Sequence, residues 1–226
     1  MFIQPIDYVH LVGELYAENA NPKDAPFMQH YMKDHFPFFG IKKPMREMLS
    51  KEIIQQYGIP DEAALKEIAR LCFQEEMREM QYFVKDLFTH VIKKLDASYL
   101  PLLESLILQK SWWDSVDFLA PKFVGKILQR YPEQIAHYPD RWIESENIWL
   151  QRSAILFQLD YKEKTDAPLL FRYITRRADS KAFFVQKAAG WALREYSKRN
   201  AEAVQHFVNT TPLPKLTVRE GLKRMS

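Results

Sequence analysis

Helical periodicity constrains this chain more than any other feature of its sequence. Apolar residues recur at helical spacing along nearly all of the 226 residues, and the alternating Val, Ile and Thr runs typical of β-strands are missing. Six glycines leave little material for hairpin turns, so we predict an all-α fold. The segments that we expect to be helical, joined by short turns, are Ile6–Ala20, Ala25–His35, Pro44–Tyr57, Asp61–Leu71, Glu75–Lys94, Tyr99–Leu108, Trp112–Ala120, Lys122–Arg130, Trp142–Ile143, Ile148–Leu159, Pro168–Ala178, Lys181–Arg199, Ala201–Val208 and Val218–Met225.

A short internal repeat refines this prediction. Ile148–Ala154 aligns with Phe183–Ala189 at an offset of 35 residues, a period typical of paired-helix solenoids. The alignment puts Arg152 and Lys187 at equivalent positions, so one face of successive repeats would present a cation. Stacked helix pairs curve, and their concave side offers a long surface to an elongated ligand. No linker divides the chain, so we expect one domain over residues 1–226.

Composition limits the class of protein. A single cysteine, Cys72, excludes an internal disulfide framework and fits a reducing compartment. The six histidines show no metal-ligand spacing, so we predict no metal. The first residues, Met1–Pro5, lack the pattern of a signal peptide and no run is long enough to cross a membrane, which predicts a soluble, cytoplasmic protein. A net charge of +3 is too small by itself to indicate a nucleic-acid partner.

The most distinctive stretch is Lys110–Asp117. Ser111 is expected to be the N-cap of a helix, with Asp114 three residues on as the acidic half of a capping box. Pro121 is expected to end this helix.

The two tryptophans of this stretch should have different roles. Trp113 lies about 100° further round the helix than Trp112, and Asp117 follows four residues later on the face of Trp113. An aromatic ring and a carboxylate side by side form a candidate site, although a solvated aspartate is the simpler alternative. The other face carries a stripe expected to be buried, made of Trp112, Val116 and Leu119.

The Lys181–Arg199 helix has an unusual second face. Opposite a core stripe, it presents Lys187, Trp191, Arg194 and Lys198 at i, i+4, i+7 and i+11. One interpretation is that the tryptophan packs against a neighbouring helix beneath lysine and arginine stems. The other is a nucleic-acid face, with cations for phosphates and an aromatic ring for a base or sugar.

At this point a family resemblance becomes clear. Ser111–Asp117 closely resembles the signature of the AlkD family of DNA alkylation repair glycosylases, which are built from HEAT-like helical repeats. The resemblance covers nearly the whole chain and includes Gln29–Met32, Phe39–Arg46, Gln151–Arg152, Lys187–Arg194 and Leu216–Lys223. It implies a right-handed solenoid of HEAT-like antiparallel helix pairs with a concave DNA-binding face.

The resemblance also implies an activity. Family members hydrolyse the N-glycosidic bond of cationic alkylated purines, typically 3-methyladenine and 7-methylguanine, in double-stranded DNA, and they use no cofactor. Noncatalytic relatives lack the aspartate, so its presence favours an active enzyme. By family match, the expected catalytic residues are Asp117, Trp113 and Trp191, and the expected DNA-binding residues are Arg152, Arg194 and Tyr31. The cationic face of the Lys181–Arg199 helix adds Lys187 and Lys198 to the expected DNA-binding residues.

Two other classes remain as alternatives. One is a catalytically silent helical-repeat DNA-binding protein, and the other is a protein-binding helical-repeat scaffold. Tyr31 has its own alternative, because a tyrosine in the core or in a cleft wall matches the pattern equally well. For the enzyme we expect a monomer in the cytoplasm, associated with the nucleoid when bound to DNA.

Overall fold

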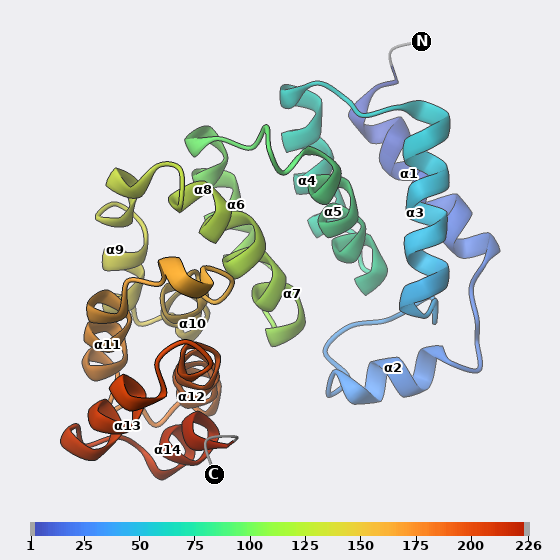
Figure 1. Cartoon of the computed structure of the whole chain (residues 1–226). Helices are drawn as coiled ribbons and strands as arrows, with labels where there is room; N and C mark the ends of the chain where they lie inside the picture. The colour runs from blue at the N-terminus through green and yellow to red at the C-terminus, as the bar shows by residue number, and fades with distance from the viewer. Residues whose placement is uncertain (1–2, 224–226) are drawn as a thin grey trace. The chain divides into compact units, whose positions relative to one another are not determined.

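The computed structural model describes residues 3–223, and that range holds helices and turns but no strand (Figure 1). The predicted all-α fold is therefore confirmed. The first two residues of the Met1–Pro5 segment and the expected helix end at Met225 lie outside the described residues. The α-helices are α1 (Pro5–Glu18), α2 (Ala25–Tyr31), α3 (Lys43–Tyr57), α4 (Glu62–Gln74), α5 (Arg78–Val91), α6 (Leu100–Leu108), α7 (Trp113–Phe118), α8 (Gly125–Leu128), α9 (Pro139–Glu144), α10 (Ile148–Leu156), α11 (Ala167–Arg176), α12 (Phe183–Ser197), α13 (Ala201–Thr210) and α14 (Lys215–Leu222).

The chain falls into two compact units, residues 1–94 and residues 95–226. In the first unit, α1 and α5 each pack against both α3 and α4. In the second, α10 lies against α6, α7, α9 and α12, and α12 contacts α13 and α14. The expectation of a single domain over the whole chain stays a prediction. Within residues 3–223, no helix has the length and apolar character needed to span a bilayer.

A period of 35 residues runs through both units. The helices α3, α5, α7, α10 and α12 begin at residues 43, 78, 113, 148 and 183, each 35 residues after the one before. The repeat predicted from α10 and α12 is thus confirmed and extends to the earlier helices α3, α5 and α7. A shared contact accompanies it, because a glutamine at the fourth helical position donates to the carbonyl six residues earlier. These bonds are Gln81 to Glu75 at 3.0 Å, Gln151 to Ser145 at 2.6 Å and Gln186 to Ser180 at 2.8 Å.

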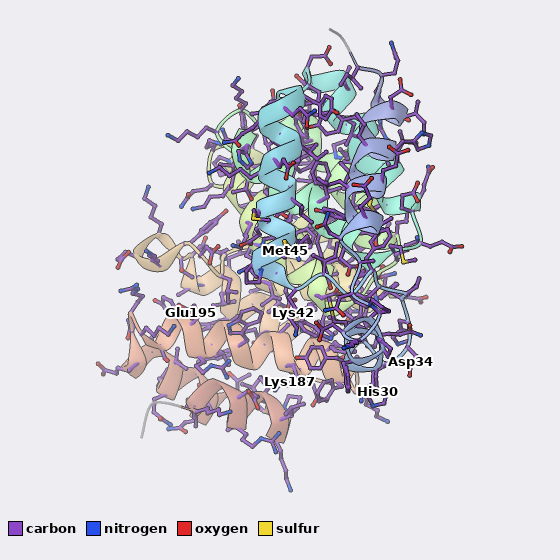
Figure 2. All side chains as sticks on the ribbon, turned by 90° about the vertical axis from the view of Figure 1, so that its right-hand side faces the viewer. His30, Asp34, Lys42, Met45, Lys187 and Glu195 are labelled. Atoms are coloured by element: carbon purple, nitrogen blue, oxygen red, sulfur yellow. The ribbon has the colours of Figure 1, made fainter. Side chains whose placement is uncertain are left out.

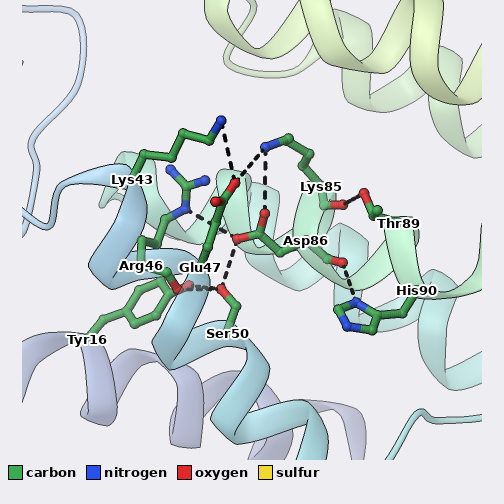
Figure 3. A network of polar contacts seen from close by, with 9 residues as sticks. All are labelled: Tyr16, Lys43, Arg46, Glu47, Ser50, Lys85, Asp86, Thr89 and His90. Carbon is green, nitrogen blue, oxygen red and sulfur yellow. Dashed lines mark hydrogen bonds and ion pairs between the residues drawn. The ribbon is translucent and has the colours of Figure 1, made fainter.

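A buried polar network ties α1, α3 and α5 together in the first unit (Figure 3). The Arg46 Nε donates to the Asp86 carboxylate over 3.3 Å, and both side chains are less than a tenth exposed. The Ser50 hydroxyl lies 2.9 Å from the same carboxylate and 2.7 Å from the Tyr16 hydroxyl. Because each buried polar group has a partner, the network fixes the relative placement of these three helices.

The segment before α3 is held by a second buried carboxylate. Glu79, at 0% exposure, accepts hydrogen bonds from the backbone N–H groups of Phe39, Gly40 and Ile41 at 3.1, 2.9 and 3.1 Å. Gly40 has a φ of 88°, and a Cβ there would lie 2.2 Å from the Asn21 carbonyl oxygen. Only glycine fits this position.

The second helix ends earlier than predicted. The expected Ala25–His35 helix already stops at Tyr31, because Lys33 and Asp34 adopt left-handed φ angles of 57° and 59°.

Candidate active site

The helix that carries the candidate site begins one residue later than predicted. Trp112, in extended conformation, is the N-cap of α7, and its side chain makes no capping hydrogen bond. The predicted capping box of Ser111 and Asp114 is wrong. The Ser111 hydroxyl instead donates to the Ile107 carbonyl at 2.6 Å, satisfying an acceptor in the last turn of α6.

The predicted end of this helix at Pro121 is also wrong. Helical structure continues from α7 through a π-helix, Leu119–Val124, into α8. A proline has no N–H to donate and its ring crowds the preceding turn. A widened π-turn at this point is a known way to keep such a helix going.

Trp112 and Trp113 are both half-buried, and Trp112 packs into a cluster of aromatic rings. The catalytic role of Trp113 stays a prediction. The Trp112 ring packs 5.0 Å from the Phe184 ring and 5.6 Å from the Trp149 ring, measured between centroids. The Phe184 and Trp149 rings are themselves 4.9 Å apart, so this aromatic cluster anchors α7 onto α10 and α12. Trp113, the first residue of α7, stays half-buried, off the stripe formed by the fully buried Val116 and Leu119.

Asp117 and Arg152 form the central ion pair of the second unit. The Arg152 Nε and Nη2 donate to the two carboxylate oxygens of Asp117 at 2.8 and 2.9 Å. The Arg152 Nη1 donates to the Phe184 carbonyl at 2.6 Å. Asp117 and Arg152 are each the fifth residue of their helix, so the contact between α7 and α10 brings equivalent positions of two repeats together.

The pair lies at the boundary between core and solvent. The Asp117 side chain is 18% exposed and that of Arg152 only 5%. Burial raises the pKa of the Asp117 carboxyl, while the hydrogen bonds and charge of Arg152 act to lower it and nearby Asp114 acts to raise it. A carboxylate has about four lone-pair directions, and a bidentate arginine occupies two of them. The remaining two can accept from water or face a cation.

Lys187, Trp191 and Arg194 lie on α12, and Lys198 is its C-cap residue. These four side chains line a polar hollow of about 500 Å³, together with Glu195, Glu220 and Lys223. Each of the three predicted cations has a carboxylate partner: Lys187 with Glu220 at 3.1 Å, Arg194 with Glu220 at 3.0 Å and Lys198 with Glu195 at 2.6 Å. Trp191 is half-buried in the wall of this hollow.

Tyr31 belongs to the first unit, on α2. Its side chain is exposed rather than in the core, and with Phe27 it lines a largely apolar hollow of about 240 Å³. Its predicted contact with DNA stays a prediction, as do those of the α12 cations.

Sequence reasoning missed two groups of residues. Glu220 and Glu195 were not predicted to pair with the cations, although Glu220 lies within the Leu216–Lys223 motif. The aromatic support from Trp149 and Phe184 was also missed, because ring contacts between helices leave no local pattern. Among residues 3–223, no three His, Cys, Asp or Glu side chains are grouped so as to hold a metal ion.

Together these features define an all-helical repeat protein with an Asp117–Arg152 ion pair between α7 and α10 and a separate polar hollow lined by Trp191 and cationic side chains. The family model described as "DNA alkylation repair enzyme" matches residues 13–225. The chain therefore belongs to the DNA alkylation repair enzyme family, which confirms the resemblance to AlkD-type proteins.

Solved structures agree with this assignment. A predicted DNA alkylation repair enzyme from Enterococcus faecalis is 33% identical, with a TM-score of 0.85 over 92% of this chain and 97% of that one. AlkD2 from Streptococcus mutans is 18% identical, with a TM-score of 0.60 over 81% of this chain and 88% of its own. The smu.31 protein from Streptococcus mutans UA159 is also 18% identical, with a TM-score of 0.60 over 79% and 90%. At 18% identity, these last two show a shared fold alone. No curated protein matches the chain.

Proposed function

We propose that this protein is a monofunctional DNA glycosylase that hydrolyses the N-glycosidic bond of cationic alkylated purines, such as 3-methyladenine and 7-methylguanine, in duplex DNA. One observation carries the proposal. In a member of a DNA alkylation repair family, the partly exposed carboxylate of Asp117, which follows Trp113 by four residues, is held by Arg152 in a bidentate ion pair. The enzyme would act as a cytoplasmic monomer.

The reaction needs electrostatic help more than proton transfer. An N3- or N7-alkylated purine already carries a positive charge, so it leaves without a strong general acid. As the bond breaks, positive charge develops on the deoxyribose, and a nearby carboxylate stabilises this oxocarbenium-like transition state while it orients the attacking water. The lone pairs of Asp117 that Arg152 does not use support this role.

Arg152 is best explained as a positioning residue. Burial alone would favour a protonated Asp117, and the bidentate arginine favours the ionised form while it fixes the plane of the carboxylate. The Arg152 side chain is 5% exposed and directs donors at Asp117 and at the Phe184 carbonyl. Its direct contact with the DNA backbone stays a prediction.

The remaining predicted residues would bind the substrate. Trp113 and Trp191 can contact cationic sugar or base atoms with their ring faces, an attraction of roughly 0.5–2 kcal/mol. Lys187, Arg194 and Lys198 would bind backbone phosphates. Tyr31 would add a contact from the first unit.

The test is a single-turnover assay on a duplex that carries one 7-methylguanine, followed by alkaline cleavage at abasic sites. We expect strand cleavage by the wild type and a loss of about 10²–10³ in rate for Asp117→Asn, the scale for removing an electrostatic stabiliser. Binding to the duplex should persist in this variant. Thermal unfolding of both proteins controls for the altered ion pair.

The same experiment separates the alternatives. Salt-sensitive binding without base release from any alkylated duplex would identify a silent DNA-binding protein. Duplex binding that is absent at low salt would favour a protein-binding scaffold, because a phosphate-binding protein loses affinity steeply as salt rises. An Asp117→Asn variant that excises at the wild-type rate would refute the assigned mechanism.

A further inference from the structure

The terminal helix α14 is pressed unusually close to α12. A Cβ on Gly190 of α12 would lie 2.5 Å from the Glu220 Cβ and 2.9 Å from the Thr217 carbonyl oxygen. On the other side, a Cβ on Gly221 would lie 3.2 Å from the Leu193 Cβ. Glycine at position 190 is therefore required for this approach. The close packing brings the Glu220 carboxylate up to the cationic face of α12.

Glu220 joins two cations through its two oxygens. Its Oε1 lies 3.1 Å from the Lys187 Nζ, and its Oε2 lies 3.0 Å from the Arg194 Nη1. The Arg194 Nη1 also donates to the Glu220 backbone carbonyl at 3.0 Å. Lys187 and Arg194 are seven residues apart, two turns along one face of α12, so the single carboxylate sets the separation of their charged groups.

The carboxylate is less accessible than the groups it binds. The Glu220 side chain is 11% exposed, against 36% for Lys187 and 22% for Arg194. Lys187 and Glu195, both labelled in Figure 2, belong to α12 and line the same hollow. The ion pair with Lys187 lowers the pKa of Glu220, so the carboxylate is ionised at neutral pH.

The cluster of Glu220, Lys187 and Arg194 keeps donors for a further anion. Arg219 also lies beside it, with its Nη2 3.9 Å from the Glu220 Oε1, so three cations surround one carboxylate and an excess of positive charge is left for a phosphodiester. An ammonium has three N–H groups and a guanidinium five, and Glu220 engages only some of them. Long side chains that are already ordered lose less entropy when they bind.

We propose that Glu220 is a positioning residue for the DNA backbone, holding Lys187 and Arg194 in the arrangement that binds phosphate. This inference rests on the proposed function, because it assigns a role within the same DNA-binding face. The Leu216–Lys223 motif, which contains Glu220, would then have a role in DNA binding as well as in packing against α12.

The test compares Glu220→Gln with Glu195→Gln in duplex binding, measured by fluorescence anisotropy with undamaged DNA over a range of salt concentrations. Both variants remove one negative charge from the same hollow, but Glu195 pairs with Lys198, three residues on, whereas Glu220 bridges Lys187 and Arg194. We expect Glu220→Gln to weaken binding by roughly three- to tenfold and to lower the salt slope by about 1, the scale of one phosphate contact. Glu195→Gln should bind at least as tightly as the wild type.

A double-mutant cycle distinguishes positioning from a general structural role. In a Lys187→Ala, Arg194→Ala background, Glu220→Gln should have no further effect on the salt slope, because the groups it positions are gone. A Glu220→Gln variant that binds as tightly as the wild type, with an unchanged slope, would overturn the inference while leaving the proposed function intact. Wild-type protein that shows no salt-dependent duplex binding would instead refute the proposed function itself.

Discussion

Replacing Arg152 should shift the pH dependence of excision as well as the stability of the fold. Arg152→Ala removes two charge-assisted bonds to Asp117 and one to the Phe184 carbonyl. Breaking a buried ion pair by removing one partner costs about 3–5 kcal/mol, because the other charge is left uncompensated. With the Asp117 side chain only 18% exposed, water relieves little of this cost.

The direction of the pH effect follows from the causes of the shifted pKa. Burial raises the pKa of Asp117 and Arg152 opposes that rise, so the pKa of Asp117 climbs further when Arg152 is lost. Since the proposed mechanism needs the carboxylate, the acid limb of the pH–rate profile moves to higher pH.

Stability should follow the same titration. A carboxyl whose folded-state pKa stands above its unfolded value contributes stability that is present at low pH and is lost as the pH rises through the folded pKa. The stability deficit of Arg152→Ala should therefore be smaller in acid and grow toward neutral pH.

The assay is single-turnover excision of 7-methylguanine at saturating protein from pH 5 to pH 9, with urea unfolding at the same pH values. Arg152→Lys is the matched control, because it keeps the cation and loses the bidentate fork. We expect it to cost about 1.5–3 kcal/mol, the value of a charge-assisted hydrogen bond, with an acid limb close to that of the wild type. An Arg152→Ala variant whose acid limb coincides with that of the wild type would refute the idea that Arg152 keeps Asp117 ionised.

Two further predictions concern the two tryptophans at the start of α7 and the close packing at Gly40 in the first unit. Trp113→Ala should slow single-turnover excision by up to about thirtyfold, the equivalent of the cation–π energy, with little change in urea unfolding. Trp112→Ala should instead lower the free energy of unfolding by about 3 kcal/mol, because its ring packs on Trp149 and Phe184; equal stability losses in the two variants would contradict the assigned roles. Gly40→Ala should destabilise the first unit by more than about 1 kcal/mol and speed amide hydrogen exchange near Gly40, whereas unchanged exchange would show that the backbone adapts to the added Cβ.

The spacing of residues along the sequence was enough to predict the fold class, the repeat and the faces of single helices. The periodicity of apolar residues predicted the all-α fold, and one aligned pair of segments predicted the 35-residue repeat. In the structure, the first residues of five helices follow this repeat. Spacing also separated Trp112 from Trp113 and put Trp113 on the face of Asp117. These features follow from the geometry of a single helix, where residues three and four apart share a face whatever the rest of the chain does.

Only the tertiary structure decided which groups meet across helices. Asp117 and Arg152 are one repeat apart, and nothing in their local sequences indicates that the arginine would turn toward the carboxylate rather than toward solvent. Glu220 reaches Lys187 and Arg194 because Gly190 lets two helices approach closely.

The helix boundaries show the same division. Ser111 and Pro121 have the residue types of a start and a stop, but the serine hydroxyl bonds to the preceding helix and a π-turn accommodates the proline. The type of a residue indicates the local conformation that it favours, but the packing of helices decides which conformation forms. Burial and hydrogen bonds between helices outweigh the modest energy of one cap or one turn.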